Sequence, residues 1–223
     1  MLRQIYDAID KRLAIKKTVS DQLDHPVPEH VNPLKHPSAF VYCFGGIAAF
    51  IGLLLFLTGL FLVIYYVPSP DHAYDSVQYI INNVTLGWLV RGIHYWGASA
   101  IVIMVVLHAL RVYFHGAYKN PREMNWVVGV LLLLIVLAFS FTGYLLPWNQ
   151  RSYWATTVGT SMVSLVPFIG NHLLQLVRGG NEVGAVTLVR FYAIHIGFLP
   201  AILLLLLGLH FFMVRKQGIS RPL

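Results

Sequence analysis

Four long stretches of the chain contain no Asp, Glu, Lys or Arg, and they constrain the fold more than any other feature. They are residues 41–67, 92–110, 124–150 and 191–214. Each matches or exceeds the roughly 18–20 residues that a helix needs to cross the hydrocarbon core of a bilayer. Only 11% of all residues are charged, against about 25% in soluble domains. The sequence predicts an all-α membrane protein whose transmembrane helices lie at about 40–67, 88–115, 123–146 and 186–215.

The segments outside these stretches predict surface helices. Near the N-terminus, apolar residues recur at helical spacing with charges between them, at Leu2, Ile5, Tyr6, Ile9 and Leu13. This pattern predicts an amphipathic helix at about 2–20, either on the membrane surface or packed against another subunit. The connection at 151–184 is apolar but interrupted by proline and glycine, which predicts two short helices along the surface. We expect one membrane domain, 1–223.

The basic residues predict the orientation of the chain in the membrane. The first connection, 68–87, contains two aspartates and no Lys or Arg. Most basic residues flank the other ends of the apolar stretches: Arg3, Lys11, Arg12, Lys16, Lys17, Lys35, Arg111, Lys119, Arg122, Arg215, Lys216 and Arg221. By the positive-inside rule, both termini and the second connection lie on the negative, cytoplasmic side. The net charge of +7 therefore serves orientation, and we expect no nucleic-acid partner.

Two of the apolar stretches each contain two histidines. Ionisable residues inside a membrane are costly and usually mark a functional site. His94 and His108 are fourteen residues apart, a rise of about 21 Å and a rotation about 40° short of four turns, so they share a helix face. His195 and His210 are fifteen apart and overshoot by about 60°. We expect local bending at Pro200 to absorb part of that offset.

The topology pairs these histidines across the second and fourth helices, which run in the same direction. His94 must meet His195 near the positive side, and His108 must meet His210 near the negative side. A zinc ion normally takes four ligands, and each pair offers two. A haem provides four equatorial nitrogens and needs only two axial ligands. The pattern predicts two stacked haem b groups, with the four histidines as iron ligands.

Glycines on the first and third helices have the same spacing as the histidines. Gly45 and Gly59 are fourteen residues apart, as are Gly129 and Gly143. Since these helices run the opposite way, Gly45 and Gly129 fall at the negative-side haem and the other two at the positive-side haem. Glycines in membrane helices also serve close packing alone, but the matched spacings favour clearance for the flat cofactors.

Arginines lie three residues from two of the histidines. Arg91 precedes His94, and Arg111 follows His108. Both can bind haem propionates, although interfacial anchoring and topology signalling also explain an arginine at such a place. Further candidates for propionate binding are Arg122 and Arg190.

Motifs along nearly the whole chain resemble one family. They are PEHVN, VYCFGG, RGIHYWGAS, LHALRVYFHGAYKNPREMNWVVG, FTGYLLPWNQ, TLVRFYAIH and MVRKQGIS. The chain resembles the short cytochrome b subunit of b6f-type and related bacterial quinol–cytochrome c, or plastocyanin, oxidoreductases. The resemblance implies transfer of electrons from a quinol oxidised at the positive side, through the two b haems, to a negative-side haem and quinone. This contributes to proton translocation, and the isolated chain is not expected to be a competent enzyme.

The resemblance also assigns further residues. A lone cysteine is usually a small buried apolar residue, but the family pattern implies that Cys43 bonds a third, c-type haem through one thioether. The implied quinol pocket wall consists of Gly143, Pro147, Trp148 and Asn149. The implied quinone and proton path at the negative side consists of Arg215 and Asp21.

Partners and location follow from the same resemblance. It implies a smaller, subunit IV-like membrane protein that completes the quinol site, a Rieske iron–sulfur protein, a c-type cytochrome and a homodimeric complex. Tyr95 and Asn149 stand where the chloroplast type has arginine and aspartate, and the motifs are closer to Gram-positive members. This favours menaquinone and a bacterial plasma membrane over a thylakoid. The alternatives are a dihaem quinone-reactive anchor of another dehydrogenase and a four-helix transporter without haem.

Overall fold

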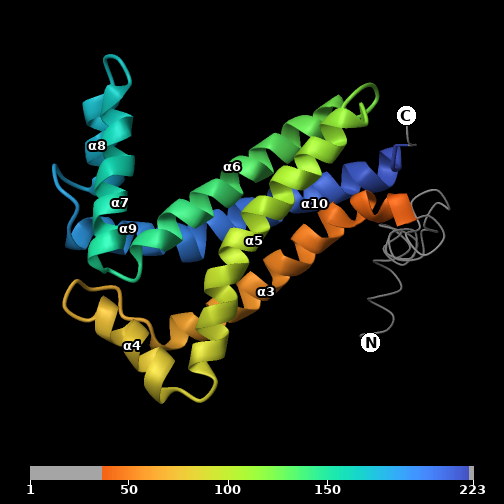
Figure 1. The fold of residues 1–223 in the computed structure, drawn as a ribbon. Coiled ribbons are helices and arrows are strands. Elements are labelled where there is room, and N and C mark those ends of the chain that lie inside the picture. The colour runs from red at the N-terminus through yellow and green to blue at the C-terminus, as the bar shows by residue number, and fades with distance from the viewer. Residues whose placement is uncertain (1–36, 221–223) are drawn as a thin grey trace, which may run out of the picture.

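The computed structural model describes residues 37–220, and every regular element in this range is a helix (Figure 1). Four helices are long and apolar enough to cross a membrane: Phe40–Tyr65, Gly87–Phe114, Glu123–Leu145 and Ala185–Gln217. The predicted four-helix membrane fold is therefore confirmed. The predicted surface helix at about 2–20, and Asp21, lie outside the described residues.

The long helices are joined by short ones. The first span comprises the 3-10 helix η2 (Pro37–Cys43) and α3 (Phe44–Tyr65), and the next two are α5 (Gly87–Phe114) and α6 (Glu123–Leu145). The last span comprises α9 (Ala185–Ala193), η4 (Ile194–Phe198) and α10 (Leu199–Gln217). Between them lie α4 (Ala73–Asn83), α7 (Gln150–Ser161), η3 (Met162–Leu165) and α8 (Gly170–Arg178). The most extensive packing joins α3 to α5 and α6 to α10.

The two ends of the bundle differ in what they carry (Figure 1). Helices α4, α7 and α8 lie at one end, which we call the α7 end. The start of the first span, the connection between α5 and α6, and the C-terminal part of α10 lie at the other, which we call the terminal end. Within the described range, the chain therefore enters and leaves the bundle on the same side.

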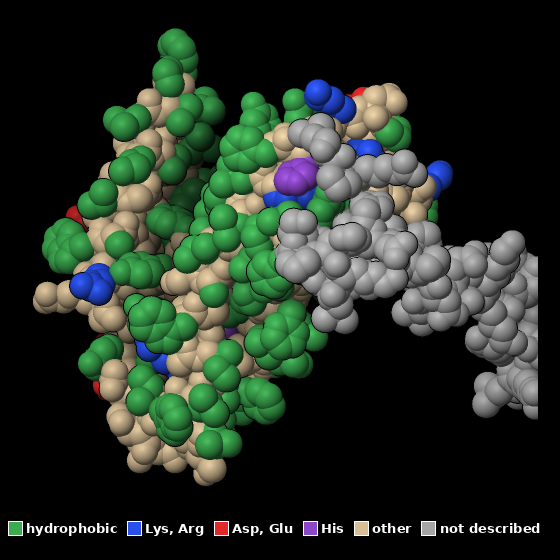
Figure 2. All heavy atoms as spheres, turned by 45° about the vertical axis from the view of Figure 1, so that its right-hand side comes forward, with side chains coloured by type: hydrophobic (Ala, Val, Ile, Leu, Met, Phe, Trp, Pro, Cys, Tyr) green, Lys and Arg blue, Asp and Glu red, His purple; other side chains and the backbone are tan. Residues whose placement is uncertain are grey.

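The outer surface of the bundle is apolar. Figure 2 shows hydrophobic side chains over most of the visible helical surface. Large apolar residues are exposed along the spans, among them Phe61 at 60% and Leu205 at 73%. Water would oppose exposure on this scale, whereas a lipid environment favours it. The exposed apolar surface is therefore the face that contacts lipid or other membrane subunits.

A small buried core lies at the α7 end. It consists of Ala73, Leu145, Val183, Leu188 and Phe191. These residues come from α4, from the end of α6, and from α9 with the segment before it. Helix α4 is an amphipathic helix that the sequence analysis treated only as a connection. The two predicted surface helices in the 151–184 connection are present as α7 and α8.

A buried arginine joins α7 to α8. Arg178 is 6% exposed, and its guanidinium donates hydrogen bonds to the Thr160 hydroxyl, the Thr157 carbonyl and the Ser161 hydroxyl. A buried cation is stable only where its donors are satisfied. Arg178 is therefore a structural clamp that holds these two helices together.

Candidate functional site

The structure brings the four intramembrane histidines together in two pairs. The ring centres of His94 and His195 are 6.4 Å apart, and those of His108 and His210 are also 6.4 Å apart. Two imidazoles bound through Nε2 to opposite sides of one metal, at about 2.0 Å per bond, have ring centres about 6.3 Å apart. Both separations therefore suit two axial ligands of a single iron. No cluster of three or more metal-binding side chains occurs in residues 37–220.

Each histidine ring faces a glycine on a neighbouring helix. A Cβ atom added at Gly143 would lie 2.7 Å from Cε1 of His195, and one at Gly45 would lie 3.0 Å from Cε1 of His108. An added Cβ would lie 3.3 Å from Cε1 of His94 at Gly59, and 3.7 Å from Cε1 of His210 at Gly129. The four glycines that the spacing singled out therefore pack directly against the four imidazoles. Their role includes clearance for the histidine rings, which the sequence analysis had not considered.

Two threonines, which the sequence analysis missed, contact the pair at the α7 end. Oγ1 of Thr58 lies 3.0 Å from Nδ1 of His94, and Oγ1 of Thr142 lies 3.0 Å from Nδ1 of His195. Each hydroxyl donates its proton to a carbonyl one turn earlier, to Leu54 or to Ala138. The repeated Thr-Gly dipeptides at 58–59 and 142–143 could have indicated them.

The hydroxyl geometry favours one tautomer for both imidazoles. A hydroxyl has one proton, and here that proton is donated to the backbone. The threonine oxygen must then accept the hydrogen bond, so Nδ1 carries the imidazole proton. Nε2 is left with its lone pair free to bind a metal, as in metal sites whose second ring nitrogen is held by a neighbouring group.

A π-helical turn brings His195 and His210 to the same face. The segment η4 (Ile194–Phe198) contains His195, and the amide of Leu199 donates to the carbonyl of Ile194, five residues earlier. A π turn includes one residue more than an α turn, so it absorbs the additional residue of the fifteen-residue spacing. Pro200 lacks an amide proton and suits this interruption of the α-helical pattern. The offset is therefore absorbed by helix unwinding rather than by bending alone.

Polar side chains gather beside the histidine pair at the terminal end. The guanidinium of Arg111 lies 3.8 Å from the ring centre of Tyr42, and the His115 ring packs edge-on against the same tyrosine. Nε and Nη2 of Arg111 are buried and have no hydrogen-bond partner within residues 37–220. Cys43 is half-buried and lies two residues before Gly45. The cluster thus offers unsatisfied cationic donors and a thiol near the same pair.

The predicted anchoring arginines differ in their surroundings. Arg91 at the α7 end lies with its guanidinium 4.7 Å from the ring centre of Tyr95. Arg122 donates to the carbonyls of Gly218 and Gln217, so it contacts the C-terminal end of α10. Arg215 lies in the last turn of α10, also at the terminal end.

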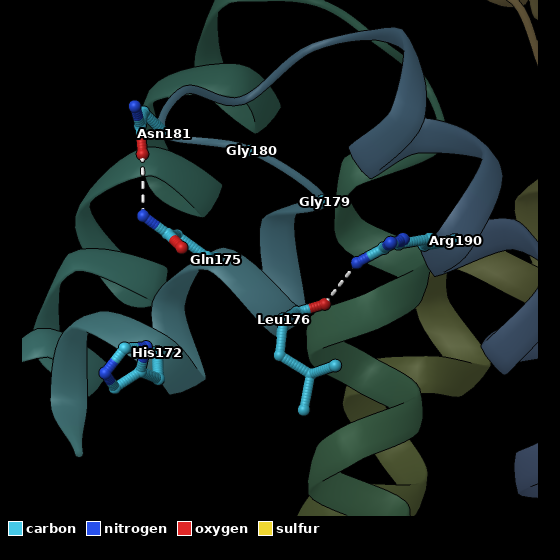
Figure 3. Close-up of a pocket in the computed structure, with 7 residues that line it drawn as sticks. All are labelled: His172, Gln175, Leu176, Gly179, Gly180, Asn181 and Arg190. Atoms are coloured by element: carbon cyan, nitrogen blue, oxygen red, sulfur yellow. Dashed lines mark hydrogen bonds between the residues drawn. The ribbon is translucent and has the colours of Figure 1, made fainter.

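Arg190 lines a shallow hollow beside α8. Figure 3 shows its guanidinium directed to the carbonyl of Leu176, to which it donates a hydrogen bond. His172 and the hydrogen-bonded pair of Gln175 and Asn181 complete much of the lining. Arg190 therefore contacts the backbone of α8, and the histidine pairs are not among the residues that line this hollow.

Four residues, Leu146, Pro147, Trp148 and Asn149, connect α6 to α7 at the α7 end, and we call them the LPWN corner. Trp148 has a left-handed backbone conformation with φ of 48°, which residues other than glycine rarely adopt. Asn149 caps α7: its Oδ1 accepts from the Ser152 amide at 2.9 Å, and the Asn149 amide donates to the Ser152 hydroxyl. Asn149 therefore has a structural role that the sequence analysis did not assign, and the N-x-x-S pattern is typical of such a cap.

Four apolar spans that hold two pairs of histidines are the architecture of a membrane cytochrome. The family described as cytochrome b/b6/petB matches residues 24–218. The chain belongs to the cytochrome b/b6 family. It is accordingly a haem b protein of the membrane and an electron-transfer subunit of a quinol–cytochrome c oxidoreductase.

Relatives match over complete chains. The chain is 53% identical over 224 residues to the menaquinol:cytochrome c reductase cytochrome b subunit of Geobacillus thermodenitrificans, covering 100% of both. It is 44% identical over 222 residues to cytochrome b6 of Synechococcus elongatus, again covering 100% of both. Among solved structures it is similar to a chain of a hyperthermophilic respiratory complex III, with a TM-score of 0.82 and 35% identity. It covers 56% of that chain, and 97% of its own residues are matched.

Proposed function

We propose that His94 and His195 bind the iron of one haem b, and that His108 and His210 bind the iron of the other. The observation that carries this proposal is the 6.4 Å ring separation repeated in both pairs, with a glycine beside every ring. When bound, each haem supplies a one-electron carrier. The chain contributes the ligands and, at the α7 end, a threonine hydroxyl that contacts Nδ1 of each histidine.

Charged side chains at the two ends complete these sites. Arg111 has buried guanidinium nitrogens without a hydrogen-bond partner in the described part of the chain, and a carboxylate is the group that best satisfies them. We infer that Arg111 binds a propionate of the haem at the terminal end, and that Arg91 serves the haem at the α7 end. Arg122 supports the same region indirectly, because it holds the C-terminal end of α10 through two carbonyls.

Cys43 is the proposed attachment point of a third haem, bound through one thioether. Cys43 directly precedes α3, and Gly45, two residues on, packs against His108. A thioether needs an accessible thiol, and Cys43 is only half-buried. This haem would lie beside the terminal-end site, between that site and a quinone. Arg215, together with Asp21 outside the described residues, is proposed to serve the quinone and its protons there.

We place the quinol-oxidation pocket at the α7 end, with Gly143, Pro147, Trp148 and Asn149 in its wall. Gly143 packs against His195, so this wall adjoins the histidine pair at the α7 end. Menaquinol is the proposed donor, because two relatives that are 53% identical are named menaquinol:cytochrome c reductase subunits. Asn149 contributes to this wall by capping α7, since its side chain is engaged with the Ser152 amide.

The proposed setting is a multi-pass position in a bacterial plasma membrane, with both termini on the cytoplasmic side. A smaller membrane subunit, a Rieske protein and a c-type cytochrome are the proposed partners within a dimeric complex. The basic residues near the terminal end, of which Arg111, Lys119, Arg122, Arg215 and Lys216 are described, support this orientation.

Spectroscopy of histidine variants tests the ligand assignment. The complete complex is purified with His210→Ala or with His195→Ala, and the haem b content is measured in reduced-minus-oxidised spectra and redox titrations. We expect each variant to lose one haem b and to retain the other, because each pair serves one iron. His115→Ala is the matched control, since His115 lies at the terminal end outside both pairs. An unchanged spectrum in either test variant would contradict the pairing.

A haem stain on a denaturing gel tests the covalent haem. We expect haem to remain on the chain after denaturation, because a thioether survives where axial ligands are lost. Cys43→Ser should abolish the stain and leave both b haems in the native complex. A stained band in Cys43→Ser, or no stain in the unmodified chain, would overturn the thioether.

A further inference from the structure

Tyr66 directly follows α3, and its side chain reaches the LPWN corner. The hydroxyl donates a hydrogen bond of 2.7 Å to the carbonyl of Leu146, a residue eighty positions further along the chain. Leu146 is the C-terminal capping residue of α6, where backbone carbonyls lack partners within the helix. The side chain that directly follows the first span therefore satisfies the backbone at the start of the corner.

The same corner is connected to the histidine pair at the α7 end. The amide of Leu146 donates to the carbonyl of Gly143 at 3.3 Å, and Gly143 packs against the ring of His195. The ring of Tyr66 also packs on that of Tyr192, with centres 5.4 Å apart. Tyr192 lies one helical turn before His195. Tyr66 thus contacts both the corner and the helix that carries an iron ligand.

The conformation of the corner needs support from several sides. Trp148 has a positive φ, and such a backbone persists only where surrounding contacts hold it. The Trp148 ring packs edge-on against Tyr153, and Asn149 is held by Ser152. The Tyr66 hydroxyl supports the corner from the α6 side. Burial, and then the neighbouring Tyr192, raise the pKa of Tyr66, so its hydroxyl remains a proton donor at physiological pH.

We propose that Tyr66 is a positioning residue for quinol oxidation, and that its hydroxyl acts by holding the Leu146 carbonyl and hence the wall formed by Pro147 and Trp148. This inference rests on the proposed quinol pocket at the α7 end. It assigns Tyr66 no chemical step, since its proton is donated to a backbone carbonyl. Loss of the hydroxyl should therefore alter the fit of the quinol more than the haem content.

The test is Tyr66→Phe in the complete, membrane-purified complex, compared with Tyr65→Phe. Tyr65 is the adjacent residue, is 42% exposed, and packs loosely on Tyr79 with ring centres 6.4 Å apart. Turnover is measured with a short-chain menaquinol analogue and a c-type cytochrome. We expect Tyr66→Phe to raise KM about fivefold, in line with the loss of one hydrogen bond, with a smaller change in kcat. Tyr65→Phe should match the unmodified complex.

A second variant separates the hydroxyl from the ring contact. Tyr192→Phe retains the ring against Tyr66 and leaves the Tyr66–Leu146 hydrogen bond in place, so its KM should be unchanged. KM does not depend on the amount of assembled complex, so partial assembly leaves the comparison valid. The proposal is overturned if Tyr66→Phe has the KM of Tyr65→Phe, if Tyr192→Phe raises KM equally, or if Tyr66→Phe abolishes assembly. Failure of the proposed function is distinct, because the unmodified complex would then lack quinol-dependent turnover.

Discussion

The two histidine pairs have the same ring separation and different surroundings. At the α7 end, His94 and His195 each contact a threonine hydroxyl through Nδ1. At the terminal end, Phe44 and Val128 precede the glycines and have no hydroxyl, and the polar group beside His210 is the backbone of Asn125. The geometry of the histidine rings is therefore repeated along the bundle, whereas the threonine contacts are not.

In the proposed arrangement of one haem at each pair, this difference would give the two haems unequal potentials. A hydrogen-bond acceptor on Nδ1 raises the basicity of the imidazole and stabilises the oxidised metal. At the terminal end, the half-buried cation of Arg111 acts in the opposite sense, because a nearby positive charge favours the reduced state. Both effects predict that the haem at the α7 end has the lower potential. An electron would then move downhill from the α7 end to the terminal end.

The largest expected effect comes from filling the space beside the rings. Gly143→Ala places a Cβ 2.7 Å from His195, closer than non-bonded carbon atoms approach, whereas Gly129→Ala places it 3.7 Å from His210, an ordinary contact. We expect Gly143→Ala to lose most of the haem at the α7 end, and Gly129→Ala to retain both haems. Haem content per complex, measured from pyridine haemochrome spectra, is the readout.

The remaining two glycines extend this comparison. A Cβ added at Gly45 would lie 3.0 Å from the His108 ring, and one at Gly59 would lie 3.3 Å from the His94 ring. Gly45→Ala and Gly59→Ala should therefore give intermediate losses of haem, with the larger loss for Gly45→Ala. A ranking that did not follow these distances would show that the glycines serve helix packing rather than clearance for the imidazoles.

Charge removal at the two ends should have the next largest effect. Arg111→Gln removes a half-buried cation, so we expect the potential of the terminal-end haem to fall by about 50 mV. Arg91→Gln should affect the α7-end haem and by less, because the Arg91 guanidinium lies against Tyr95 and is more easily screened. Redox titration of the two haems is the measurement. Equal shifts at both haems for either variant would contradict the separate assignments.

Much of this arrangement could be predicted because it depends on spacing. The charge-free stretches determine four spans, and the fourteen-residue intervals of His94 and His108 on one helix, and of Gly45 and Gly59 on another, determine which residues share a face. Residues that act through local hydrogen bonds were missed. Thr58 and Thr142 look like ordinary polar residues of membrane helices, which usually bond their own backbone, and the sequence does not indicate that their oxygens also face a histidine.

The elements that deviate from regular helix were the hardest to predict. The π turn at η4 changes the face that His195 presents, and its presence depends on which amides and carbonyls remain paired around Pro200. Helix α4 is only eleven residues long, and it packs on the bundle by burial of Ala73 and Ile80. Likewise, the function of Asn149 as a cap depends on where α7 begins. In each case the decisive contact is tertiary or concerns an element boundary.

Removal of a threonine hydroxyl should have a smaller effect, restricted to one haem. Thr142→Val removes the acceptor for Nδ1 of His195 with little change in shape, so we expect the potential of the α7-end haem to rise by about 30 mV. Thr142→Ser retains the hydroxyl and should behave like the unmodified protein. The measurement is again a redox titration, in which the terminal-end haem serves as an internal reference. If the potential of the terminal-end haem rose instead, the substitution would be acting through a change in the whole structure and not through the hydrogen bond to His195.

The smallest effect should come from giving the terminal end the support that it lacks. Val128 precedes Gly129 as Thr142 precedes Gly143, and it is 5% exposed. In Val128→Thr, the new hydroxyl can donate to the carbonyl of Met124, one turn earlier, and accept from Nδ1 of His210. We expect the potential of the terminal-end haem to fall by about 20 mV, with Val128→Ala as the control for lost volume. If threonine and alanine gave the same titration, the hydroxyls would not be what distinguishes the two sites. A fall seen only with threonine would show that the residue preceding each of the two α6 glycines influences the potential of the adjacent haem, at either end of the bundle.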